Sequence, residues 1–345
     1  MSHYGPAGTG GTGGTGGTGG TGGTGGSGGP EAAPAFAIVI RPIGTSPTRD
    51  HRNYWYPGVK WPPSDQPLPG HDTRSVPFPE WAWDPALFAI AVIGEFVKYT
   101  PPASSDPPAW YNVPVPHWTS LPGFTSSTLQ REIDELVELI DYRTDVLQET
   151  LAQAGDFVHY WGGLLMFNQQ SHPWTHRIAR IAISVGEFTM MYYKRKFSRP
   201  RPSQLSPALM PPIGVPPHAS YPSGHSTQAW LLSRLLERVL PDTVTNPAIP
   251  PGWVDPPMNP GDPDPAPRSM LYRLAERVAR NREVMGLHYP SDSRAGFILA
   301  KGIADILLRL DHIPKPGPRH TPPATSFMTM NDMINLAHHE WDSVP

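Results

Sequence analysis

Residues 176–196, HRIARIAISVGEFTMMYYKRK, place apolar side chains at the spacing of an α-helix. Four of them follow one another at intervals of three or four positions: Ile181, Val185, Phe188 and Tyr192. Residues at this spacing share one face of a helix, and an apolar face must be buried against another element. The stretch therefore predicts a long amphipathic helix that packs into a helical core.

Six further stretches show a helical pattern, and none of the chain shows a strong strand pattern. One of these helices follows a predicted capping box, formed by Ser127 and Gln130. The six predicted helices span residues 84–98, 128–151, 225–240, 268–287, 293–311 and 326–341. The predicted fold is all-α: a helical bundle with long Pro-rich loops and an extended, partly disordered N-terminal segment.

The composition fits a soluble globular protein with long irregular connections. Of the 345 residues, 38% are hydrophobic and 17% are charged, while 46 are proline and 33 are glycine. The formal net charge of −3 is too small to indicate a polyanionic partner, so no nucleic acid is expected to bind. The lack of cysteine excludes disulfide bonds and thiolate metal sites.

Nothing in the sequence predicts a membrane span or a signal peptide. The first residues, MSHYGPAGTGGTGG, lack the basic and apolar regions of a secretory signal. The longest apolar run, residues 86–97, is too short to cross a bilayer. The expected location is therefore the cytoplasm.

Changes in composition divide the chain into three parts. Residues 1–33 are dominated by a Gly-Gly-Thr repeat with nothing to bury, which predicts a disordered tail. Residues 34–122 are rich in proline and tryptophan, and they are predicted to wrap the core with one helix of their own. Residues 123–345 are predicted to form the helical domain.

Three polar stretches carry candidate chemistry, and the first is residues 194–202, KRKFSRPRP. It begins in the last turn of the helix predicted at 176–196 and contains five cations: Lys194, Arg195, Lys196, Arg199 and Arg201. Positive charge complements the C-terminal end of a helix dipole, and a basic run is often a solvated face or a nucleic-acid patch. On its own, the stretch is compatible with each of these interpretations and also with an anion-binding site.

The second stretch is residues 220–227, SYPSGHST, directly before a predicted helix. Ser223 could simply cap that helix. Alternatively, Gly224 would let an oxyanion approach the backbone, the free amides of the first helical turn would bind it, and His225 would move a proton.

The third stretch is residues 281–292, NREVMGLHYPSD, in which Arg282, His288 and Asp292 stand six and four residues apart. Asp292 could cap the next helix, hold the second imidazole nitrogen of His288, or do both. Together the three stretches supply guanidinium groups, a lysine, a hydroxyl, helix amides and two imidazoles. This set can bind a phosphate-like oxyanion and divide the covalent and proton-transfer work.

In order and internal spacing, the three stretches resemble the signature of the superfamily of type 2 phosphatidic acid phosphatases and vanadium-dependent haloperoxidases. The matching patterns are Lys-x6-Arg-Pro from Lys194, Pro-Ser-Gly-His ending at His225, and Arg-x5-His-x3-Asp from Arg282. The resemblance is to a soluble, bacterial-type member, and it covers about residues 170–312. Asn281 stands where the third motif often has serine.

The resemblance implies a phosphoric monoester hydrolase, similar to acid phosphatases, that acts on a small phosphorylated substrate and needs no metal. His288 would attack phosphorus to form a phosphohistidine, Asp292 would orient it, and His225 would protonate the leaving alcohol and then activate water. The resemblance assigns a further set to the oxyanion: Lys194, Arg201, Ser223, the Gly224 amide and Arg282. Residues 123–345 would then be the catalytic domain.

Two alternatives stay open. The same groups would hold vanadate as the cofactor of a haloperoxidase, with His288 as the axial ligand of vanadium. In that branch, similar to bromoperoxidases, a second histidine lies near the oxyanion, and His218 matches its position five residues before Ser223. The simpler interpretation is that His218 is an ordinary loop residue. Otherwise His218 and Asn281 are candidates for residues that contact the site residues without touching the oxyanion. The other alternative is a non-catalytic phosphate or nucleic-acid binder, and the oligomeric state is open, a homo-oligomer included.

Overall fold

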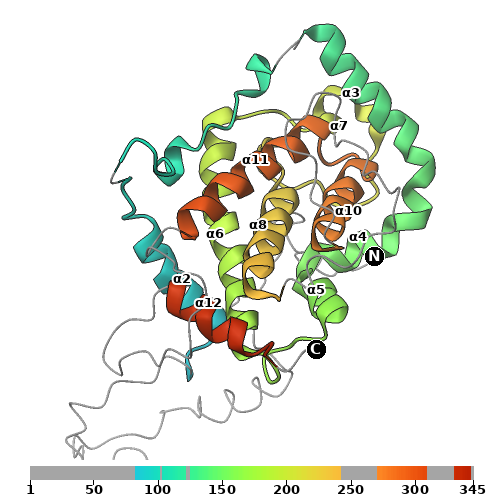
Figure 1. The fold of residues 1–345 in the computed structure, drawn as a ribbon. Coiled ribbons are helices and arrows are strands. Elements are labelled where there is room, and N and C mark those ends of the chain that lie inside the picture. Colours follow the sequence, from blue (N-terminus) through green and yellow to red (C-terminus); the bar gives the residue numbers. More distant parts are fainter. Residues whose placement is uncertain (1–81, 102, 122–124, 242–269, 309–329, 343–345) are drawn as a thin grey trace, which may run out of the picture.

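In the computed structural model, the described residues are 82–101, 103–121, 125–241, 270–308 and 330–342. Within these ranges the chain is all-α and forms a helical bundle, with no β-strand (Figure 1). The predicted fold class is therefore confirmed. The predicted tail, residues 1–33, lies outside the described residues. No helix in the described ranges combines the length and the apolar character needed to span a bilayer.

Helix α8 (Gly224–Val239) lies in the middle of the bundle. It packs against three long helices: α6 (Pro173–Phe197), α10 (Met270–Val284) and α11 (Pro290–Leu307) (Figure 1). Nearly every residue of α8 is buried, so its polar side chains need partners inside the protein. Gln228, for example, donates to the carbonyl of Ile183 on α6 at 3.1 Å. These contacts fix the start of α8 relative to its neighbours.

Shorter helices surround this core. Two of them pack on α6: α2 (Pro85–Phe96) and α12 (Met330–His339). The others are α3 (Ser126–Glu138), α4 (Arg143–Gly155), α5 (Val158–Leu165), α7 (Pro202–Leu205) and the 3₁₀ helices η5 (Trp110–Asn112), η6 (Trp118–Ser120), η7 (Leu139–Tyr142) and η8 (Pro207–Leu209). Helix α2 is the one α-helix in the described part of residues 34–122, while the division into three parts stays a prediction.

The prediction of one helix over residues 128–151 is wrong. Helix α3 ends at Glu138, the 3₁₀ turn η7 follows, and α4 begins at Arg143. At this break, Arg143 donates to the carbonyls of Met210 (3.1 Å) and Val284 (3.0 Å). These partners are distant in sequence, so helical periodicity gives no sign of them.

The predicted capping box is also wrong in detail. The N-cap of α3 is Thr125, whose hydroxyl accepts from the Thr128 amide at 3.2 Å. Gln130 instead donates to Asp134 one turn later, at 2.8 Å. The sequence pattern also gave no indication of α5 or of the single-turn helix α7.

Gly296 allows α11 to approach the first turn of α8. A Cβ at this position would lie 2.7 Å from the Cβ of Ser226 and 2.9 Å from the backbone oxygen of Ser223. Both distances are shorter than van der Waals contact, and backbone cannot rotate away. We expect Gly296→Ala to lower the free energy of unfolding by about 1–3 kcal/mol, as measured by urea denaturation.

Gly94 provides the control for this substitution. It is exposed on α2, and a Cβ there would meet no atom within 4 Å. Because alanine is a better helix former than glycine, Gly94→Ala should leave stability unchanged or raise it by up to about 1 kcal/mol. Equal effects of the two substitutions would contradict the close approach of α8 and α11.

Candidate functional site

The three motif stretches meet at one end of the bundle, where α6 ends, α8 begins and the loop between α10 and α11 lies (Figure 1). Lys194 Nζ donates to the carbonyls of Ala219 (2.8 Å) and Ser220 (2.9 Å), which precede α8. The Ser223 amide donates to the carbonyl of Asp292 at 2.9 Å. The end of α6, the segment before α8 and the start of α11 are therefore in direct contact.

His288 lies within this cluster and is 2% exposed. Its Nδ1 is 3.1 Å from Asp292 Oδ2, and its Nε2 is 3.1 Å from Arg201 Nη1. A guanidinium N–H can only donate, so Nε2 carries the lone pair and Nδ1 donates its proton to Asp292. Asp292 thus holds His288 in one tautomer, with Nε2 unprotonated.

Burial and neighbouring charges keep His288 neutral and Asp292 ionised. Burial lowers the pKa of His288 well below its usual value, and the charge of Arg201 lowers it further. Burial by itself would raise the pKa of Asp292. The charge of Arg199 and hydrogen bonds from His288 and Ser220 outweigh that effect and hold the pKa of Asp292 below its usual value.

Three motif cations are buried without a carboxylate partner. Lys194, Arg201 and Arg282 are at most 3% exposed, and none of them forms a salt bridge within the described ranges. Arg282 donates through Nη2 to the carbonyl of Thr150 at 2.9 Å, while its Nε and Nη1 have no partner among the described residues. Burial lowers the pKa of Lys194 well below its usual value, that of Arg201 to about 10 and that of Arg282 to about 9. Lys194 and Arg201 act on the ring of His288, whereas the charges that act on Arg282 are those of Tyr160 and Glu149. An anion beside either set of cations would supply the missing negative charge.

The start of α8 supplies the second motif. Ser223 caps the helix, because its hydroxyl accepts from the Ser226 amide at 3.4 Å, and the simpler interpretation of this residue is confirmed. Gly224 follows at the first helical position, where backbone amides have no intrahelical acceptor. His225 is fully buried, and its Nε2 is 2.9 Å from the carbonyl of Gln153 on α4. A carbonyl can only accept, so Nε2 carries a proton.

The predicted residues form two hydrogen-bonded groups. The first surrounds His288, whose ring contacts Arg201 and Asp292 directly. His218 joins this group through Arg201, and Lys194 joins it through the carbonyl of Ser220, whose hydroxyl donates to Asp292.

The second group lies against α4. His225 contacts the carbonyl of Gln153, Arg282 contacts that of Thr150, and Asn281 Nδ2 donates to Gln153 Oε1 at 3.1 Å. Helix α4 therefore covers the second group with two of its carbonyls, a contribution that no motif predicts.

His218 contacts Arg201 rather than lying free in a loop. Its Nδ1 accepts from Arg201 Nη2 at 3.0 Å, so its proton is on Nε2, a buried atom without a partner in the described ranges. Burial, together with Lys194 and Arg201, lowers the pKa of His218 to about 4. A cavity of about 630 Å³, lined by residues of 198–204 and 215–219, reaches both His218 and Arg201. The cavity therefore borders the His288 group at these two residues.

Sequence reasoning missed the residues that hold Asp292. The Ser220 hydroxyl donates to Asp292 Oδ2, and Arg199 Nη1 donates to Asp292 Oδ1 at 2.8 Å. Arg199 Nη2 donates to Glu132 Oε2 at 2.8 Å, across 67 positions of sequence. Arg199 and Ser220 lie inside the motif stretches, so the sequence offered a reason to consider them. Glu132 lies on α3, and no nearby sequence pattern indicates a role for it.

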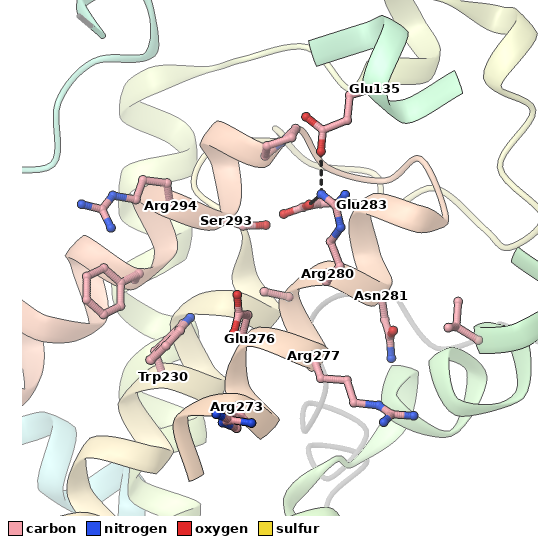
Figure 2. A pocket seen from close by; sticks show the side chains of 14 residues that line it. Glu135, Trp230, Arg273, Glu276, Arg277, Arg280, Asn281, Glu283, Ser293 and Arg294 are labelled. Atoms are coloured by element: carbon pink, nitrogen blue, oxygen red, sulfur yellow. Dashed lines mark hydrogen bonds and ion pairs between the residues drawn. The ribbon is translucent and has the colours of Figure 1, made fainter. Parts of the chain in front are cut away.

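A second cavity, of about 620 Å³, is lined mainly by side chains of α10 and α11, with Glu135 of α3, Val146 of α4 and Trp230 of α8 (Figure 2). There Arg280 bridges Glu135 (2.7 Å) and Glu283 (2.5 Å), and burial raises the pKa of Glu283 to about 7. Asn281 is the one predicted site residue in its lining. Arg280 thus has two carboxylate partners, in contrast to Lys194, Arg201 and Arg282.

No family model matches the chain, and no curated protein matches it. Within the described ranges, no group of three or more histidine and acidic side chains is arranged to hold a metal ion. Any chemistry assigned to the site must therefore be argued from its own residues.

Proposed function

We propose that the chain is a phosphoric monoester hydrolase that transfers the phosphoryl group first to His288 and then to water. One observation supports the proposal above all: an unprotonated His288 Nε2 next to buried cations that lack carboxylate partners. A phosphoryl transition state carries charge on three equatorial oxygens. Lys194, Arg201 and Arg282 would neutralise that charge, and the Gly224 amide and the Ser223 hydroxyl would add hydrogen bonds.

In the first step, the lone pair of His288 Nε2 attacks phosphorus while the bond from phosphorus to the leaving oxygen breaks. Asp292 stabilises the positive charge that develops on the ring through its hydrogen bond to Nδ1. His225, protonated on both nitrogens and held at Nε2 by the Gln153 carbonyl, gives its Nδ1 proton to the leaving alcohol. In the second step, neutral His225 takes a proton from water through Nδ1. The water oxygen attacks phosphorus, the bond to Nε2 breaks, and phosphate leaves.

One observation favours a second candidate, a vanadium-dependent haloperoxidase. The buried Nε2–H of His218 lies beside Arg201 and would donate to an oxyanion or to a peroxide at the site. The donor set also fits vanadate, which has the charge and shape of phosphate: His288 Nε2 would be its ligand, and the three buried cations would hold its oxygens. Bound vanadate would supply the activation of peroxide.

A paired assay on one preparation separates these functions. The first arm measures hydrolysis of p-nitrophenyl phosphate with and without vanadate, and the second measures bromide oxidation with vanadate and hydrogen peroxide. Hydrolysis that vanadate inhibits, without bromide oxidation, supports the proposal. Bromide oxidation that requires vanadate selects the haloperoxidase. Salt-dependent binding of DNA or phosphate without either activity selects a binding protein.

The pH dependence of hydrolysis follows from the state of His288. Attack needs the neutral ring, and burial together with Arg201 lowers the pKa of His288 well below its usual value. Protonation that would stop the reaction then occurs only at more acid pH, so kcat/KM should be retained at about pH 5, below the ordinary histidine pKa of about 6.5. A profile whose acid limb has its midpoint at or above about pH 6.5 would contradict this assignment.

A further inference from the structure

Arg199 joins helix α3 to the candidate site. Its guanidinium is 1% exposed, and Nη1 donates to both Asp292 Oδ1 (2.8 Å) and Ser291 Oγ (2.7 Å). Its Nη2 donates to Glu132 Oε2 at 2.8 Å, and Glu132 Oε1 accepts from the Ser291 amide at 2.8 Å. Glu132 therefore contacts both the arginine and the first turn of α11, the turn that carries Asp292.

Aromatic rings hold the guanidinium in place. Its central carbon is 3.7 Å from the centroid of the Tyr289 ring and 5.4 Å from that of Trp118. Such stacking leaves the planar group few orientations, so the donors of Arg199 stay aimed at the two carboxylates. A lysine would keep the charge without this fixed fork.

The two oxygens of Asp292 have different partners. Oδ1 accepts from Arg199, while Oδ2 accepts from Nδ1 of His288 and from the Tyr289 amide, each at 3.1 Å. We propose that Arg199 and Glu132 are positioning residues, which act through Asp292 to keep His288 in the tautomer with an unprotonated Nε2. The proposal rests on the proposed function, in which that Nε2 is the nucleophile.

Two opposing effects set the pKa of Asp292. Burial by itself raises the pKa of this carboxyl, and the charge of Arg199 is the main opposing effect. Loss of Arg199 would raise the pKa of Asp292, and a protonated Asp292 would donate to His288 Nδ1 instead of accepting from it. His288 would then carry its own proton on Nε2, and no lone pair would point at phosphorus.

The kinetic test compares three variants with a matched control. Arg199→Met should lower kcat about 10- to 100-fold with little change in KM, and it should move the acid limb of the pH profile to higher pH. Arg199→Lys should recover part of kcat, and Glu132→Gln should give a smaller loss than Arg199→Met. The control is Arg180→Met, which removes a different, partly exposed ion pair (Arg180 to Asp156, 2.5 Å) and should change neither kcat nor the pH profile.

Nitrogen-15 NMR of the histidine rings reads the tautomer without reference to activity, with the His288 signals assigned by their loss in His288→Gln. The proton should lie on Nδ1 in the wild type and move to Nε2 in Arg199→Met. An unchanged tautomer together with an unchanged pH profile would overturn the proposal. If Arg199→Met does not fold, Arg199→Lys and Glu132→Gln decide in the same way. A tautomer shift in a protein that hydrolyses no phosphomonoester would uphold the positioning role and reject the proposed function.

Discussion

His288→Ala is expected to abolish formation of a phosphoenzyme and to lower kcat by about 10⁴-fold or more. The substitution removes the nitrogen that is unprotonated, 3.1 Å from Arg201 and held in its tautomer by Asp292. No other imidazole in the described ranges combines these contacts. The measurement is trapping of labelled phosphate from a labelled monoester, with an alkaline quench because phosphohistidine is stable in base.

The control for this variant is His176→Ala. His176 is a partly buried histidine, and burial lowers its pKa to about 4. It lies on α6 eighteen positions before Lys194, about 27 Å along the helix. Trapping should persist in His176→Ala. Label retained at the wild-type level in His288→Ala would mean that another group forms the covalent bond, and the proposed mechanism would be wrong.

The helices were predictable because their apolar periodicity is local. The helices predicted from the apolar stripes of residues 176–196 and 225–240 correspond to α6 and α8, with nearly the same bounds. The break at η7 was not predictable, because it is accompanied by hydrogen bonds from Arg143 to Met210 and Val284. Local pattern therefore predicted the long helices but missed the short helices α5 and α7, and tertiary contacts determine where one predicted helix is interrupted.

The site was predictable where its contacts are short in sequence. His288 and Asp292 are four residues apart at the start of a helix, and their hydrogen bond follows from that spacing. The basic stretch was different: Arg195 is exposed, while Arg199 and Arg201 are buried with different partners. Nothing in a run of alternating cations indicates which of them face inward. The α4 carbonyls that accept from the second group are backbone atoms, so the residue types of α4 do not indicate these contacts.

Arg282→Met is expected to make the protein more stable, by about 1–4 kcal/mol in urea denaturation without phosphate. The guanidinium is fully buried, makes no salt bridge within the described ranges, and leaves Nε and Nη1 without partners there. Replacing it with an apolar side chain of similar length removes the cost of this buried charge and strands no carboxylate. The Thr150 carbonyl loses one donor but lies within α4, where the helix supplies another.

The same substitution should lower kcat about 10²- to 10³-fold, because one donor to the transition-state oxygens is lost. Phosphate at 100 times its dissociation constant should stabilise the wild type by about 2.7 kcal/mol and should stabilise Arg282→Met much less. Arg277→Met is the control, since Arg277 is on the same helix, 64% exposed and paired with Glu149; it should change stability by less than about 1 kcal/mol and leave kcat unaltered. A variant of Arg282 that is both more stable and inactive would mean that the buried charge is retained for an anion and not for the fold. A variant that is less stable yet still active would assign the charge to the fold, and the proposed oxyanion site would lose one of its three cations.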